Sequence, residues 1–173
     1  MRKTLVRRIL NRALGKLAMA LPGSTSLRPL LHRLRGVQIN GTVFIGDDVY
    51  LENEYPECVT IEDGAQICLR TTIIAHTRGT GQIIVGKNAF ISACCIIIAP
   101  EGATLRIGEG AVAGAGAVIS SDIPAATLVA PERIRAYAQV TVPFTMHTGY
   151  EEFRRGLRPL NLNPRKSSAE PKK

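Results

Sequence analysis

The feature that most constrains the fold of this chain is a large aliphatic residue that recurs every six positions through its middle. The recurring residues form four groups of three: Ile39, Ile45 and Leu51; Ile61, Ile67 and Ile73; Val85, Ile91 and Ile97; and Ile107, Ala113 and Ile119. The residue four places further on is usually small or β-branched. A period of six matches neither the 3.6-residue helix nor the two-residue alternation of a simple strand. It predicts a coil in which three six-residue faces form about one turn of a parallel β-helix.

The spacing between the groups predicts where loops leave the coil. Their first residues are 22, 24 and 22 positions apart, whereas three six-residue faces need only 18. The surplus residues place loops around 55–58, 77–82 and 100–102. Because the turns stack, such insertions can project close to one another. We expect function there, since a strict repeat only builds the scaffold.

The repeat divides the chain into four parts. We predict a basic helical arm at 1–36, a β-helix of about four rungs at 37–124, a closing segment at 125–160 and a disordered tail at 161–173. The fold class is therefore all-β, with an N-terminal helical arm and a C-terminal extension. No uninterrupted apolar stretch follows the charged N-terminus, so we expect neither a secretory signal nor a membrane span, and a cytoplasmic protein.

Positive charge is concentrated in the arm. Residues 1–36 hold nine of the 22 Lys and Arg and no acid, whereas the remainder of the chain has 13 bases against 14 acids. Apolar residues recur at helical spacing on one side of residues 2–20. Two compatible interpretations follow: the arm packs over the open end of the coil, or it rests on the inner face of an anionic membrane.

Two further observations limit the classes of function. The repeat carries four bases against ten acids and few aromatic residues, which is not typical of a nucleic-acid-binding surface. The four cysteines show neither a CxxC pair nor the spacing of a disulfide framework, so we expect small core residues in a reducing compartment. We therefore predict no nucleic-acid partner and no metal.

His76 is the candidate functional residue that the sequence singles out. It is the only one of the three histidines that lies in the repeat, and it stands where a strand enters the longest predicted loop. A histidine in that place is held by a rigid element and reaches an irregular one, which favours a role in proton transfer.

Several runs of residues within the repeat resemble those of a known family. The runs Val85-Gly86-Lys87-Asn88-Ala89-Phe90-Ile91 and Ile107-Gly108-Glu109-Gly110-Ala111-Val112-Ala113-Gly114-Ala115-Gly116-Ala117-Val118, with Asp122-Ile123-Pro124 after them, are similar to those of hexapeptide-repeat acyltransferases. The resemblance covers about residues 37–130 and implies a left-handed β-helix, a homotrimer and an acyl-coenzyme A donor such as acetyl-CoA. Ser121 and residues 129–133 depart from the pattern common in that family.

The resemblance also implies roles for particular residues. His76 would act as general base on a carbohydrate hydroxyl, and the backbone N–H of Ala93 would stabilise the oxyanion. The candidates for orienting the base are Glu52, Asn53 and Glu54. The donor would lie along the lower rungs, near Ala113, Gly114 and Gly116, with its phosphates at Arg133 and Arg135.

Other functions remain open at this stage. The same base could serve N-acylation of an amino sugar, and a β-helix of this kind could be a scaffold without catalysis. A zinc hydratase of the same fold would need about three imidazoles, whereas only His76 lies in the repeat.

Overall fold

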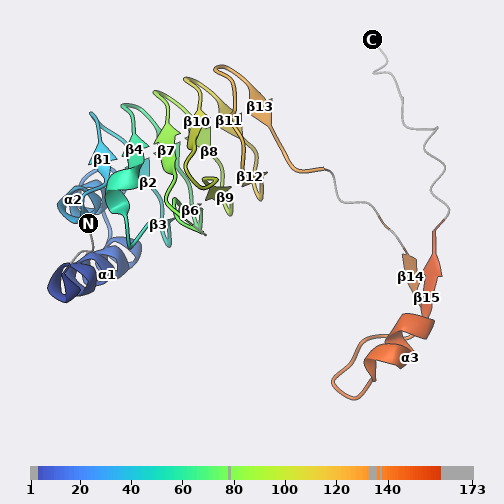
Figure 1. Cartoon of the computed structure of the whole chain (residues 1–173). Coiled ribbons are helices and arrows are strands. Elements are labelled where there is room, and N and C mark those ends of the chain that lie inside the picture. The colour runs from blue at the N-terminus through green and yellow to red at the C-terminus, as the bar shows by residue number, and fades with distance from the viewer. Residues whose placement is uncertain (1–3, 78, 133–135, 137, 161–173) are drawn as a thin grey trace, which may run out of the picture. The chain divides into compact units, whose positions relative to one another are not determined.

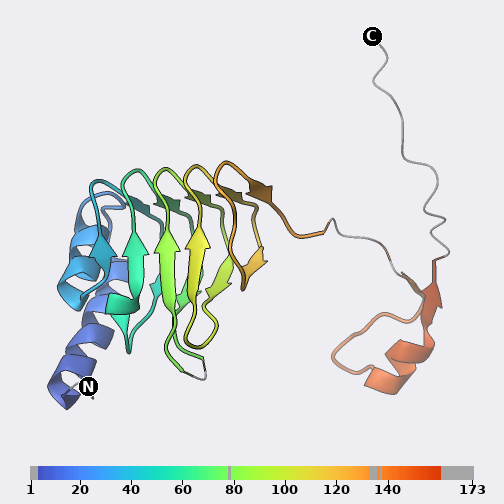
Figure 2. The same cartoon turned by 45° about the horizontal axis from the view of Figure 1, so that its top comes forward.

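The chain forms two compact units, Met1–Pro131 and Glu132–Lys173, in a computed structural model that describes residues 4–77, 79–132, 136 and 138–160. The first unit is a left-handed parallel β-helix with two helices at its N-terminal end (Figures 1 and 2). The predicted tail at 161–173 lies outside the described residues.

Three parallel sheets form the faces of the coil. Sheet A contains β1 (Gln38–Ile39), β4 (Val59–Ile61), β7 (Gln82–Val85) and β10 (Thr104–Ile107). Sheet B contains β2 (Phe44–Ile45), β5 (Gln66–Ile67), β8 (Phe90–Ile91), β11 (Val112–Ala113) and β13 (Leu128–Val129). Sheet C contains β3 (Tyr50–Leu51), β6 (Thr72–Ile74), β9 (Ile96–Ile98) and β12 (Val118–Ile119).

The six-residue repeat is the register of these sheets. Ile39, Ile61, Val85 and Ile107 are aligned across sheet A, and the other two series are aligned in the same way across sheets B and C. All twelve recurring residues are buried. Each large aliphatic side chain removed from water contributes about 1.5–3 kcal/mol, so the stack of inward side chains supplies most of the stabilisation of the coil. The prediction of a β-helix of about four rungs is confirmed.

The coil runs further than Pro124. Ile123 bridges to Ile107 in sheet A, and β13 pairs with β11 in sheet B, so a fifth turn begins before the unit ends at Pro131. The spacing of inward residues changes here: Ile123 follows Ile119 by only four positions, with no loop between them, although the six-residue step returns from Ile123 to Val129. In the second unit, β14 (Ala138–Val140) pairs antiparallel with β15 (Leu157–Pro159), and helix α3 (Tyr150–Arg155) lies in the segment that connects them.

Helix α2 (Leu27–Arg35) covers the open edge of the first rung by means of three arginines. Arg33 donates to the carbonyl of Ile39 in β1, Arg28 to that of Ile45 in β2, and Arg35 to that of Leu51 in β3. These carbonyls belong to the last residues of β1, β2 and β3, the strands of the first rung. The outer edge of this rung pairs with no other strand of the three sheets. An unpaired sheet edge needs such partners. Part of the basic character of the arm is therefore structural.

Helix α1 (Leu5–Ala20) lies beside α2 at the same end of the coil (Figure 1). Thr4 caps it through a hydrogen bond from the Arg7 N–H, and α2 ends at Gly36, whose φ of 109° suits glycine. The interpretation in which the arm packs over the end of the coil is confirmed for these two helices.

Burial of His32 in α2 predicts acid sensitivity. Burial, with the nearby Arg35 charge, lowers the pKa of His32 from 6.5 to about 3. The unfolded chain therefore takes up this proton first, and stability falls as the pH drops from 6.5 towards 3, by about 1.4 kcal/mol per pH unit. We expect His32→Gln to weaken this dependence in denaturant titrations. Equal slopes for the two proteins between about pH 4 and 7 would contradict it.

Candidate functional site

The three predicted loops meet at one corner of the coil, where sheet C passes into sheet A. The short 3-10 helix η1 (Pro56–Cys58) lies in the first loop, between β3 and β4. The ring of Tyr55 in this loop meets the ring of His76 edge to face, with centroids 5.6 Å apart. In the second and third loops, the Gly102 N–H donates to the carbonyl of Thr80 at 3.1 Å. The expectation that the insertions project near one another is confirmed.

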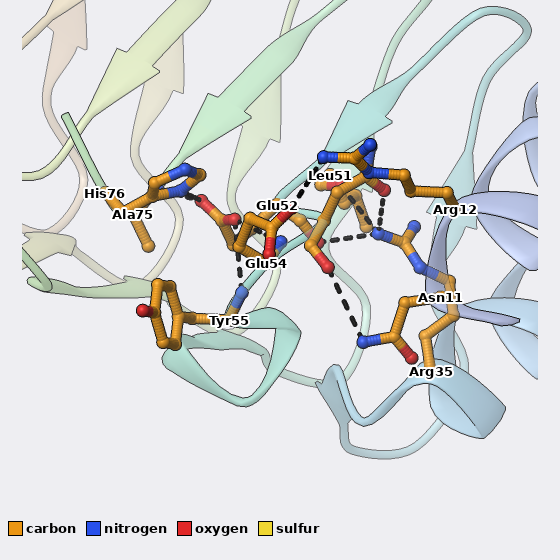
Figure 3. A network of polar contacts seen from close by, with 10 residues as sticks. Asn11, Arg12, Arg35, Leu51, Glu52, Glu54, Tyr55, Ala75 and His76 are labelled. Atoms are coloured by element: carbon orange, nitrogen blue, oxygen red, sulfur yellow. Dashed lines mark hydrogen bonds and ion pairs between the residues drawn. The ribbon is translucent and has the colours of Figure 1, made fainter. Parts of the chain in front are cut away.

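A buried carboxylate holds His76 at this corner (Figure 3). Glu52 follows β3, and His76 follows β6, the neighbouring strand of sheet C. Their side chains meet with His76 Nδ1 2.6 Å from Glu52 Oε2. The side chain of Glu52 is fully buried, whereas that of His76 is 35% exposed. Of the three residues proposed to orient the base, Glu52 is the one in contact with it.

Both oxygens of Glu52 are surrounded by backbone donors. Oε1 accepts from the N–H groups of Glu54 at 2.8 Å and Tyr55 at 3.2 Å, and Oε2 accepts from the N–H of Ala75 at 2.9 Å. A glutamic acid is ordinarily a stronger acid than the imidazolium ion, so the proton of a Glu–His contact lies on the ring nitrogen. The fourth partner, His76 Nδ1, is then the donor in the shortest of these contacts.

This network determines what the imidazole can do. A neutral ring that donates from Nδ1 has an unprotonated Nε2, which is an acceptor. The hydrogen bond to Glu52 also fixes the ring orientation, and its negative charge stabilises the imidazolium that forms when Nε2 takes a proton. The corner therefore contains an oriented, partly exposed proton acceptor.

The structure places Asn53 and Glu54 in other contacts. Asn53 Oδ1 accepts from Arg35 at 2.5 Å. The carboxylate of Glu54 pairs with Arg8 at 2.9 Å and Arg12 at 2.7 Å, and the Arg8 hydrogen bond is the main cause that lowers the pKa of Glu54. Neither side chain is in the Glu52–His76 contact.

Ala93 lies at a different corner, where sheet B passes into sheet C. It follows β8, and its carbonyl accepts from the Gly116 N–H of the next rung at 2.9 Å. Its own N–H has no hydrogen-bond partner in the described part of the chain. Ala93, Gly114 and Gly116 thus share the corner at which the strands of sheet C begin, whereas His76 lies at the corner where these strands end.

The predicted donor-binding residues are placed unevenly. The side chain of Ala113 is fully buried in the core, and the Gly114 N–H donates to the carbonyl of Val129 at 2.7 Å, so these groups are engaged within the coil. A Cβ added at Gly116, whose φ is 75°, would have no heavy atom within 4 Å. Arg133 and Arg135 lie outside the described residues.

Two residues near the site were not predicted. Arg35 is 1% exposed, and its guanidinium joins α2 to the Leu51 and Glu52 carbonyls on the segment that carries the buried carboxylate. Burial lowers the pKa of Arg35 to about 10. Tyr55 packs on the His76 ring. The sequence shows only that Arg35 belongs to a basic stretch and Tyr55 to a loop.

No cluster of three or more His, Cys, Asp or Glu suited to a metal ion occurs within the described ranges. Comparison of the chain with models of protein families, and with curated proteins, finds no match. What bears on its function is therefore its fold and the geometry of these corners.

Proposed function

We propose that this protein is a coenzyme A-dependent O-acyltransferase, with acetyl-CoA as donor and a carbohydrate hydroxyl as acceptor. The observation that carries the proposal is the partly exposed His76, oriented by the buried Glu52 at the corner where three loops meet. The hexapeptide repeat and its resemblance to the acyltransferases supply the reaction class. The fold alone is compatible with this chemistry and does not identify it.

The reaction would be direct transfer within a ternary complex. His76 Nε2 takes the proton of the acceptor hydroxyl while its oxygen attacks the thioester carbonyl carbon. The carbonyl oxygen becomes an oxyanion, for which the free N–H of Ala93 is the donor. When the tetrahedral intermediate collapses, the C–S bond breaks, and the protonated Nε2 returns its proton to the coenzyme A thiolate.

The separation of His76 and Ala93 bears on the assembly. Ala93 precedes β9 and His76 follows β6, so the two residues lie at opposite ends of the strands of sheet C. One chain therefore does not bring the base and the oxyanion donor together, whereas adjoining copies could place one corner of each side by side. This supports a homotrimer with active sites between its copies.

Mixed assemblies would test this arrangement. Cys94 has a φ of 59°, which makes Ala93 the second residue of a turn in which proline is favoured, so Ala93→Pro removes the N–H with little strain. We expect turnover to fall by about 10²–10³-fold. Co-expression of Ala93→Pro with His76→Ala should restore activity if the two groups come from different copies.

The matched control for this experiment is Lys87→Pro. Lys87 precedes Asn88 (φ 55°) at the corner between sheets A and B, so it takes the same turn position without a predicted role. We expect it to keep its activity. Mixed assemblies that remain inactive, although both chains are present in them, would rule out the shared site.

The reaction class is tested by coenzyme A release. The protein is incubated with acetyl-CoA and a panel of sugars, and the free thiol is measured with and without each acceptor. We expect acceptor-dependent release and a product whose acetyl group hydroxylamine removes, as it does from an ester. A hydroxylamine-stable product indicates N-acylation of an amino sugar. No release with any acceptor would favour a non-catalytic scaffold.

A further inference from the structure

Helix α1 is amphipathic, but its apolar face points away from the protein. Five aliphatic side chains on this face are between 44% and 75% exposed: Leu5, Val6, Ile9, Leu10 and Leu17. We call them the apolar stripe. The buried residues of α1 are instead Asn11, Gly15 and Ala18. Large aliphatic side chains in water and small or polar ones inside reverse the usual arrangement of a surface helix.

The contacts of the inner face fix this orientation. A Cβ at Gly15 would lie 2.9 Å from Asn53 Oδ1 and 3.0 Å from Arg35 Nη1, so a larger residue there would displace these two side chains. Asn11 Nδ2 lies 3.5 Å from the Asn53 carbonyl. The outward position of the apolar stripe therefore follows from how α1 packs on the coil.

Exposed apolar side chains of α2 add to this end of the molecule. Leu30 and Leu34, one helical turn apart, are 49% and 54% exposed. The Leu34 carbonyl accepts from Arg7 of α1 at 3.2 Å, which ties the two helices together. Exposed apolar surface gathered in this way marks an interaction site rather than ordinary surface.

The charge around the apolar stripe indicates the partner. Lys16, Arg8 and Arg12 are exposed on the same helix, and the two arginines share the single carboxylate of Glu54. Arg33 donates to the carbonyls of Ile39 and Gly41 and forms no ion pair with an acidic side chain of the described residues. Residues 1–36 contain no acid. The surface thus combines exposed aliphatic side chains with excess positive charge.

We propose that α1 and the adjoining face of α2 dock on an anionic membrane surface. A helix of this composition lies in the plane of the interface, with its aliphatic side chains among the acyl chains and its bases at the lipid phosphates. A second copy of the same surface would place two uncompensated basic faces against each other, which disfavours self-association. No described helix is long and apolar enough to cross a membrane. The proposal does not depend on the acyl transfer.

A single tryptophan tests the contact directly, because the chain contains none. In the full chain carrying Ile9→Trp, we expect a blue shift of the emission on addition of vesicles with about 30% phosphatidylglycerol in phosphatidylcholine. Pure phosphatidylcholine should produce little shift. Val118→Trp is the matched control, since Val118 is 68% exposed on β12 in the last complete rung, remote from the arm.

Vesicle flotation of the full chain tests the apolar and the charged parts separately. We expect Ile9→Gln combined with Leu17→Gln to weaken binding at least about tenfold, and salt well above about 0.1 M to weaken it as well. Leu128→Gln, at an exposed position of β13, should bind as the unchanged protein does.

Three results would overturn the proposal. They are an equal emission shift for Val118→Trp, equal binding to neutral vesicles, and an absence of vesicle binding. If vesicles do not bind and the paired glutamine changes lower the mass of the assembly in solution, the apolar stripe is a contact between copies instead.

Discussion

We expect His76→Ala to lower kcat for acyl transfer by about 10²–10⁴-fold while the β-helix and its assembly persist. The substitution removes the only proton acceptor that the Glu52 network orients. The side chain is 35% exposed and lies outside the buried core, so little packing is lost. Because the base acts mainly in the transition state, KM for the acceptor should change far less than kcat.

Coenzyme A release measures this effect, with the melting temperature and solution mass recorded for the same samples. His147→Ala is the matched control, because His147 is exposed in the other unit. We expect it to leave turnover unchanged. If His76→Ala turns over as fast as the unchanged protein, the residue is not the general base.

The second large effect is expected for Glu52→Gln. An amide has one oxygen, whereas both positions of the carboxylate face backbone N–H groups. If the amide oxygen takes the place of Oε1, its NH2 group opposes the Ala75 N–H and donates to His76 Nδ1. The ring must then carry its proton on Nε2, where it cannot accept one. The corresponding change in a serine protease triad costs about 10⁴-fold, and we expect a loss of about 10²–10⁴-fold in kcat here.

A structural defect alone would not change the tautomer, so the ring itself provides the decisive measurement. The ¹⁵N shifts of His76 should report a protonated Nδ1 in the unchanged protein and a protonated Nε2 in Glu52→Gln. Glu62→Gln is the matched control: Glu62 follows the repeat residue Ile61 as Glu52 follows Leu51, but its partner is Asn40. Full turnover in Glu52→Gln would show that Glu52 does not position the base.

A second substitution at the same position, Glu52→Ala, is expected to destabilise the corner more than Glu52→Gln does. Glu52→Ala leaves three N–H groups at a buried site without the carboxylate, at about 1–3 kcal/mol each, and so is expected to disturb the corner itself. Glu52→Gln keeps most of the hydrogen bonds. A comparison of the two separates loss of the corner from loss of the correct tautomer.

The sequence alone was sufficient to predict the coil, the inward side chains, the position of the loops and the strand end at which His76 stands. Each depends on a periodicity that the chain itself repeats, because every rung packs only on its neighbours and so imposes the same six-residue pattern. Where the spacing changed, between Ile119 and Ile123 at the start of the fifth turn, the prediction stopped short.

Only the tertiary structure decided which of three adjacent polar residues meets His76. The sequence alone gives no reason to prefer Glu52, Asn53 or Glu54. In the structure their side chains have different partners: His76, Arg35 and the arginines of α1, respectively. It also decided that the apolar stripe of α1 faces outward. Both outcomes depend on contacts between residues 18 or more positions apart, and no local sequence pattern predicts which of these side chains will meet.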